Sequence, residues 1–196
     1  MPSTVSRMPR RSLTLRVAAT LAALTLGASL TACADTTRIP PAPTDTGAAE
    51  PLFASDEEAL AAAVEAYEEY AAVVDALLMG REPSVPLEAV ASGALVEQTL
   101  EDVAEFAELG WVITEGRQTL NPRLQSRQPV GDGGELVVLY FCEDVSQVDV
   151  IDSAGESVVN EDRDPFTPFE ATIRLESGDE PLVLERRVWE GSGICI

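Results

Sequence analysis

Residues 135–142, ELVVLYFC, decide the fold, because this run is almost continuously apolar. Such a run between turn signals predicts a central strand that is buried on both faces of a sheet. It follows a glycine-rich turn at residues 131–134, and a strand region at residues 111–114 and 119–128 precedes it, interrupted at Asn121-Pro122. After a turn at residues 152–155 and an irregular stretch at 157–168, two alternating runs at residues 169–176 and 182–189 flank a turn at 177–180, the pattern of a β-hairpin.

The segment before these strands has helical periodicity. Ser55 with Glu58 three residues later forms a capping box, which predicts that a helix begins there. Its expected buried stripe, at spacings of three and four, is Leu60, Val64, Tyr67, Ala71, Val74 and Leu78. The charged residues Glu58, Glu65, Glu69 and Asp75 fall largely off this stripe and are expected to face water. Gly80 is expected to end the helix near Met79.

A short helical turn is predicted at residues 87–91 and a longer helix at residues 94–109, ending at Gly110. The expected buried stripe of the longer helix is Leu95 or Val96, Thr99, Leu100, Val103, Phe106 and Ala107. Its opposite ridge is Glu97, Glu101, Glu105 and Glu108, whose mutual repulsion favours full solvation. Helices followed by antiparallel strands predict an α+β fold, with the N-terminal helices packed on a curved antiparallel sheet.

The N-terminus has the three parts of a secretory signal. Four arginines precede an apolar stretch from Val17 to about Leu30, which is shorter than the roughly 20 residues of a membrane-spanning helix. Leu30-Thr31-Ala32-Cys33 resembles the lipobox of bacterial lipoproteins. The resemblance implies a signal peptide at residues 1–32 and lipidation of Cys33 by a diacylglyceryl group, which would anchor the protein stably. The alternative is an ordinary signal cut nearby, which leaves Cys33 as a free thiol.

Residues 33–54 follow as a lipidated N-terminus and a flexible linker rich in Pro, Thr and Ala, and residues 55–196 form the domain. The chain after residue 32 has nine arginines against 34 acidic residues, a net charge of −25. This charge argues against nucleic acid, because phosphate binding needs a basic patch. A solvated acidic surface is the plainest interpretation, and attraction to cations or to a basic partner is the functional alternative.

The chain has no histidine, so Ser-His-Asp and Cys-His catalytic pairs are excluded. Three cysteines without histidine cannot complete a four-ligand zinc site. Residues 160–164 superficially resemble a calcium loop, but Pro165 stands where that loop needs glycine and Ala171 where it needs glutamate. We therefore expect no metal site and no cofactor, and we assign no catalytic residue.

If Cys33 is lipidated, Cys142 and Cys195 are the two cysteines left in an oxidising compartment. This count points to a Cys142–Cys195 disulfide, and the alternative is two unpaired thiols.

The order of elements resembles that of the nuclear transport factor 2-like (cystatin-like cone) superfamily, and more narrowly of actinobacterial lipoproteins with such a domain behind a lipobox. The residues of the resemblance are the helical run 60–67 (LAAAVEAY), Leu109-Gly110-Trp111, the strand end 141–144 (FCED), the turn 152–155 and the closing hairpin, and together they span residues 55–195. The resemblance implies a conical pocket between the helices and a curved sheet. It assigns no catalytic residue, because the superfamily contains both enzymes and binding proteins.

The expected function is therefore that of a non-catalytic lipoprotein, held at the extracytoplasmic face of the cell membrane by its lipid anchor, which binds a small ligand or an envelope protein. One alternative is an enzyme resembling the SnoaL cyclases or ketosteroid isomerase, with a buried Asp or Glu base. The other is an acidic, cation-binding surface protein.

Overall fold

The computed structural model describes residues 51–131 and 133–195. The predicted signal peptide, Cys33 and most of the predicted linker lie outside these residues. The helices are α1 (Asp56–Leu78), a short 3₁₀ helix η1 (Leu87–Ala89) and α2 (Ala94–Leu109). The strands are β1 (Val112–Ile113), β2 (Gln118–Val130), β3 (Gly134–Asp144), β4 (Val150–Ile151), β5 (Phe166–Glu176) and β6 (Leu182–Val188). No helix in the described ranges is long and apolar enough to cross a membrane.

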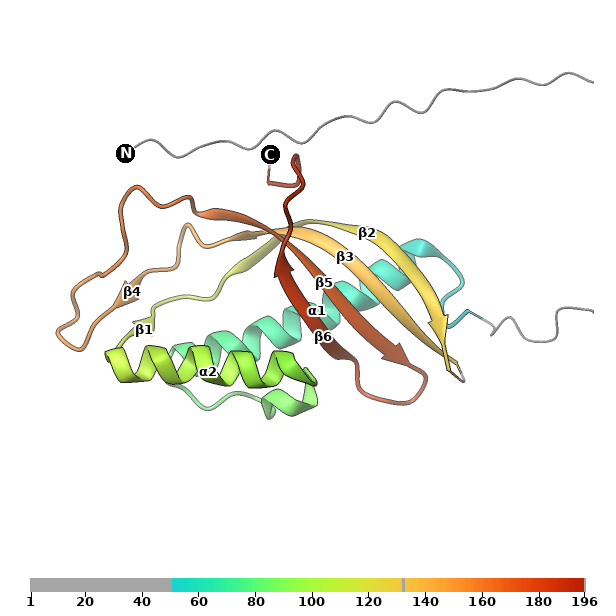
Figure 1. Cartoon of the computed structure of the whole chain (residues 1–196), viewed down its shortest axis with the longest axis horizontal. Coiled ribbons are helices and arrows are strands. Elements are labelled where there is room, and N and C mark those ends of the chain that lie inside the picture. The colour runs from blue at the N-terminus through green and yellow to red at the C-terminus, as the bar shows by residue number, and fades with distance from the viewer. Residues whose placement is uncertain (1–50, 132, 196) are drawn as a thin grey trace, which may run out of the picture. The chain divides into compact units, whose positions relative to one another are not determined.

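The main sheet is a four-stranded antiparallel meander in the order β2-β3-β5-β6, and β1 pairs with β4 in a separate two-stranded sheet. Both helices pack on one side of the curved main sheet (Figure 1), which confirms the predicted α+β class. The predicted closing hairpin is β5 and β6. The predicted irregular stretch ends earlier than expected, because β5 begins at Phe166 and pairs along its whole length with β3.

The two faces of β3 differ in burial. Val137, Leu139 and Phe141 are completely buried beneath the helices. Leu136, Val138 and Tyr140 alternate with them on the other face and are only partly buried. The prediction that this strand is buried on both faces is therefore wrong, because no helix covers the far face of the sheet within the described chain.

Helix α1 begins as predicted. The Ser55 hydroxyl accepts a hydrogen bond from the Glu58 amide at 3.2 Å, and the Glu58 carboxylate accepts one from the Ala54 amide at 3.0 Å. The helix ends at its C-cap Met79, next to Gly80.

The buried stripe of α1 is rotated from the predicted one. Tyr67, Ala71 and Val74 are buried as expected, whereas Leu60, Val64 and Leu78 are only partly buried. Their place is taken by small residues that let the helix axis approach the strands closely, namely Ala59, Ala63 and Ala66. The prediction that Asp75 faces water is also wrong: it is 5% exposed and forms an ion pair with Arg117.

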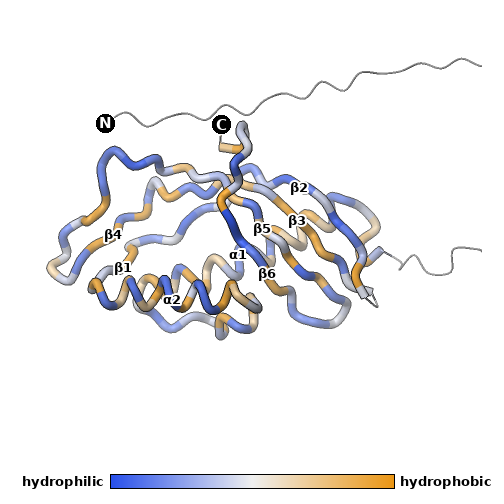
Figure 2. The backbone as a smooth tube through the Cα atoms, viewed as in Figure 1, coloured by the Kyte–Doolittle hydropathy of each residue, from blue (hydrophilic) through white to orange (hydrophobic). Residues whose placement is uncertain are grey.

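Helix α2 has the predicted bounds, but it buries less than predicted. Polar and apolar residues alternate around it (Figure 2), yet its fully buried residues are only Leu95 and Thr99. The predicted buried residues Leu100 and Ala107 are exposed instead. The predicted stripe assumed that the whole length of α2 packs on the domain. Instead, α2 contacts the rest of the domain mainly through its first half, which includes a 3.1 Å hydrogen bond between the hydroxyl groups of Tyr70 and Thr99.

The C-terminal segment folds over the face of the sheet away from the helices (Figure 1). The Trp189 ring stacks on Tyr140 with 4.7 Å between ring centroids. The predicted disulfide joins Cys142 to Cys195, with Cα atoms 5.0 Å apart. The alternative of two unpaired thiols is therefore wrong.

The residues just before α1 are also part of the fold. Leu52 and Phe53, which fall within the predicted linker, pack against the hydrophobic core. The Leu52 amide donates a 2.8 Å hydrogen bond to the Glu135 carboxylate at the start of β3, and Arg127 of β2 lies beside that carboxylate.

Candidate functional site

A cluster of five polar side chains lies between α1 and one end of the main sheet. We call it the arginine–carboxylate cluster. Three elements and one loop bring it together: α1, the loop before β2, β3 and β6. Its members are Tyr67, Asp75, Arg117, Glu143 and Arg186.

Asp75 and Arg117 form the first half of the cluster. The Arg117 guanidinium donates from Nε to Asp75 Oδ1 at 2.7 Å, and its Nη2 lies 2.6 Å from the same oxygen. The Arg117 backbone amide donates to Asp75 Oδ2 at 3.0 Å. A Cβ atom at Gly116 would lie only 2.9 Å from Asp75 Oδ2. The absence of a side chain at Gly116 therefore lets the loop backbone approach the carboxylate.

Glu143 forms the second half. The Tyr67 hydroxyl donates to Glu143 Oε1 at 2.5 Å, and Arg186 Nη2 donates to Oε2 at 2.6 Å. Arg186 Nε lies 3.0 Å from the Tyr67 hydroxyl, and the Arg186 guanidinium stacks 3.6 Å above the Phe169 ring. Arg117 Nη1 is 3.8 Å from Glu143 Oε1, which links the two halves.

The cluster has two arginines and two carboxylates, so its formal charge is zero. Burial raises the pKa of Tyr67 far above its ordinary value of 10.0, against the opposing effect of Arg186, and Glu143 raises it further. Burial by itself would lower the pKa of both arginines. For Arg117 the negative charges of Glu143 and Asp75 outweigh this effect, so its pKa is raised. Tyr67 and Glu143 do the same for the pKa of Arg186. Tyr67 is therefore a neutral donor and both arginines are charged at physiological pH.

A pocket of about 230 Å³ opens between the two helices and reaches this cluster. We call it the interhelical pocket. Half of its ten lining residues are apolar or aromatic, and the other half are polar or charged: both arginines of the cluster, two acidic residues of α2 and Thr99. The lining residues are Tyr70, Val74, Leu78, Thr99, Asp102, Val103, Glu105, Phe106, Arg117 and Arg186.

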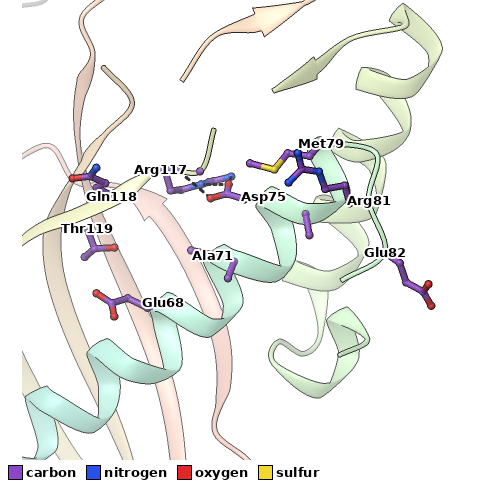
Figure 3. Close-up of a pocket in the computed structure, with 12 residues that line it drawn as sticks. Glu68, Ala71, Asp75, Met79, Arg81, Glu82, Arg117, Gln118 and Thr119 are labelled. Atoms are coloured by element: carbon purple, nitrogen blue, oxygen red, sulfur yellow. Dashed lines mark hydrogen bonds and ion pairs between the residues drawn. The ribbon is translucent and has the colours of Figure 1, made fainter. Parts of the chain in front are cut away.

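A second hollow of about 580 Å³ lies on the other side of α1, and we call it the outer groove (Figure 3). Ala71 and Met79 give it an apolar floor, and Glu68 and Arg81 are among its charged residues. The Asp75–Arg117 pair lies at this groove, where Figure 3 shows it bridging α1 and the start of β2. Arg117 therefore lines both hollows.

The carboxylates of the cluster have few free oxygens. Both oxygens of Asp75 accept from Arg117, and both oxygens of Glu143 accept from Tyr67 or Arg186. A general base must reach the substrate proton itself, and neither carboxylate lines the interhelical pocket. Asp75 does line the outer groove, where it lies beside Arg117. Asp102 and Glu105 do line the interhelical pocket together with both arginines, but they are exposed. The enzyme alternative requires a buried pocket carboxylate beside an arginine, and of the two hollows only the outer groove provides one.

The residues predicted from sequence have separate locations. Cys142 and Cys195 join on the far face of the sheet, away from the cluster, and Cys33 lies outside the described residues. Among residues 51–131 and 133–195, no group of three or more Cys, Asp or Glu side chains is arranged to hold a metal ion.

The cluster was not predicted from the sequence. One signal was present for Glu143, because it continues the period-two series of Val137, Leu139 and Phe141 and so falls on the buried face. Nothing in the local sequence pairs it with Arg186, which is 43 residues away.

Comparison with known proteins gives little further guidance. No family model matches the chain, and no curated protein matches it. Among solved structures, the intermembrane space region of the chloroplast protein ARC6 aligns with 67% of this chain and 97% of its own, at 15% identity and a TM-score of 0.47.

Proposed function

We propose that this protein is a lipid-anchored, extracytoplasmic binding protein that holds a small ligand in the interhelical pocket and does not catalyse a reaction. The observation that supports it is the pocket itself, in which apolar and aromatic side chains of both helices lie beside two arginines. Binding sites for small molecules have this composition, and they often lie between packed elements. The pocket is smaller than the roughly 300 Å³ at which sites for drug-sized ligands begin, so the ligand is small.

The non-catalytic part of the proposal rests on the hydrogen bonds of the cluster. Asp75 and Glu143 are held by two arginines and a tyrosine and do not line the interhelical pocket. The carboxylates that do line it, Asp102 and Glu105, are exposed on α2, so this pocket has no buried carboxylate base. A nuclear transport factor 2-like cone, with the pocket at its mouth, is the finer fold that we propose for the helices and the curved sheet.

The enzyme alternative keeps one supporting observation, Asp75 at the outer groove. Asp75→Asn distinguishes the two functions once a ligand is known. Under our proposal, neither the wild type nor the variant changes that ligand chemically. Turnover by the wild type that disappears in Asp75→Asn would overturn the non-catalytic function.

The anchor is tested separately in the bacterial host. Cys33→Ala should move the protein from the membrane fraction into the medium and abolish incorporation of labelled fatty acid. Thr36→Ala, three residues further on, is the control and should stay in the membrane fraction with its label. A Cys33→Ala protein that remains membrane-bound would contradict the anchor.

The binding function is tested by identifying what the protein retains. The Cys33→Ala chain is purified without detergent, unfolded and extracted, and the extract is examined by mass spectrometry. Val103→Trp should fill the pocket and remove the ligand, whereas Leu100→Trp on the exposed side of α2 should retain it. Equal recovery from both variants would show that the interhelical pocket is not the binding site.

A further inference from the structure

Both arginines at the interhelical pocket have unused hydrogen-bond donors. Arg186 donates through Nε and Nη2, and Arg117 through its backbone amide and Nε, with Nη2 in ion-pair contact with Asp75. The Nη1 group of Arg117 lies 3.8 Å from Glu143, beyond hydrogen-bond distance, and the Nη1 group of Arg186 makes no hydrogen bond with the described residues. Each Nη1 group therefore keeps its donors for another molecule.

These groups are accessible to solvent. In the described part of the chain, no fully buried side-chain nitrogen or oxygen lacks a hydrogen-bond partner. The unpaired Nη1 groups are therefore not fully buried, and the side chains of Arg117 and Arg186 are 14% and 21% exposed. The interhelical pocket is the hollow that both arginines line, whereas the outer groove is lined by Arg117 alone of the two and a hollow beside β6 by Arg186 alone. A molecule that contacts both guanidinium groups therefore lies in the interhelical pocket.

The charge around the pocket decides what kind of acceptor is suitable. The two guanidinium charges are already balanced by Asp75 and Glu143, so a carboxylate ligand would give the buried site a net negative charge. Asp102 and Glu105 line the same pocket and would repel it. An uncharged oxygen acceptor takes the donors without this cost.

We infer that the ligand is a small, mainly apolar, uncharged molecule with a carbonyl oxygen, which accepts hydrogen bonds from Arg117 and Arg186. This inference rests on the proposed binding function and specifies its ligand class. The body of the molecule packs against Val74, Val103 and Phe106, and the Tyr70–Thr99 bond holds the two helices beside it.

Three probes of similar shape test the ligand class by calorimetric titration of the Cys33→Ala chain without detergent. Acetophenone has an uncharged carbonyl, ethylbenzene has no acceptor, and benzoate has a carboxylate. Acetophenone should bind at least about tenfold more tightly than ethylbenzene, because a hydrogen bond from a charged donor contributes that much. Benzoate should bind more weakly than acetophenone.

Each other outcome overturns a defined part of the proposal. Equal affinity for acetophenone and ethylbenzene would show that the guanidinium groups recognise no acceptor, and the binding function would survive. Tightest binding by benzoate would show an anion site. No binding of any probe at millimolar concentration would count against the binding function itself.

Variants assign the effect to the arginines. Arg186→Lys keeps the charge beside Glu143 but removes the unused Nη1 group, so acetophenone should lose most of its advantage while ethylbenzene affinity is unchanged. Arg187→Lys, the neighbouring and exposed arginine, is the control and should leave the ratio unchanged. Arg117→Lys provides the same test if circular dichroism shows that Arg186→Lys does not fold. An unchanged ratio in the folded variant would overturn the inference.

Discussion

Replacing Asp75 by asparagine should destabilise the domain by about 3 kcal/mol, because it leaves the Arg117 charge buried without its partner. Removing one partner of a buried ion pair costs roughly 3–5 kcal/mol. The lower end applies because Arg117 is 14% exposed and keeps the more distant Glu143 at 3.8 Å. If the amide nitrogen of the new side chain takes the place of Oδ2, it also faces the Arg117 backbone N–H, so that two donors meet.

Thermal unfolding followed by circular dichroism measures this cost. For a domain of this size, about 3 kcal/mol corresponds to a fall in Tm of about 10 °C. Glu69→Gln, an exposed position on the same helix, is the matched control and should change stability by less than about 0.5 kcal/mol.

A second substitution tests the physical reason. Arg117→Met in the Asp75→Asn background removes the unpaired charge and leaves Glu143 balanced by Arg186, so the cluster returns to zero charge. The double variant should be more stable than the sum of the single effects predicts, by about 2 kcal/mol. Additive single effects, with a coupling energy below about 0.5 kcal/mol, would refute the claim that the pair acts as a buried unit.

Three other predictions concern the same fold. Tyr67→Phe should cost about 2 kcal/mol at neutral pH through loss of the bond to Glu143. Because the pKa of Tyr67 is raised in the folded state, stability of the wild type should fall as pH rises above 10.0, where only the unfolded chain releases this proton. The free energy of unfolding of Tyr67→Phe, measured with urea at each pH, should fall less steeply above pH 10.0 than that of the wild type. An equal dependence on pH would contradict the raised pKa of Tyr67. Reducing the Cys142–Cys195 bond, whose cysteines are 53 residues apart in sequence, should lower the free energy of unfolding by up to about 4 kcal/mol; no change in the urea midpoint would show that the bond does not restrain the unfolded chain. Gly116→Ala should cost about 1–2 kcal/mol, since its Cβ would lie 2.9 Å from Asp75 Oδ2, and wild-type stability would mean that the loop moves freely.

The sequence predicted the elements of this fold better than their contacts. The capping box at Ser55, the glycine at residue 110 and the alternation in β5 are local signals, so the start of α1, the end of α2 and the end of β5 followed from them, whereas the start of β5 did not. Burial depends on which face meets a neighbour. The alanines of α1 were not expected to lie deepest, because small side chains give a weak periodic signal although they permit the closest packing.

The candidate site was harder to predict for the same reason. Asp75 lies one residue after the buried Val74, and helical periodicity alone predicted that it faces water. Its burial depends on Arg117, whose loop approaches α1 through Gly116. A contact between residues 42 positions apart has no counterpart in local sequence patterns.

The hydrogen bond from the Leu52 amide to Glu135 has a mechanical consequence. It fixes the preceding chain to the first residues of the central strand, beside Arg127, before α1 begins. If the chain is tethered at Cys33, tension on the tether reaches this junction first, where the covalent chain leads into α1 and the Leu52–Glu135 hydrogen bond leads into β3. The hydrogen bond would then share the load between the helix and the central strand, which its ladders with β2 and β5 hold in place, so that the N-terminus of α1 does not take the whole pull.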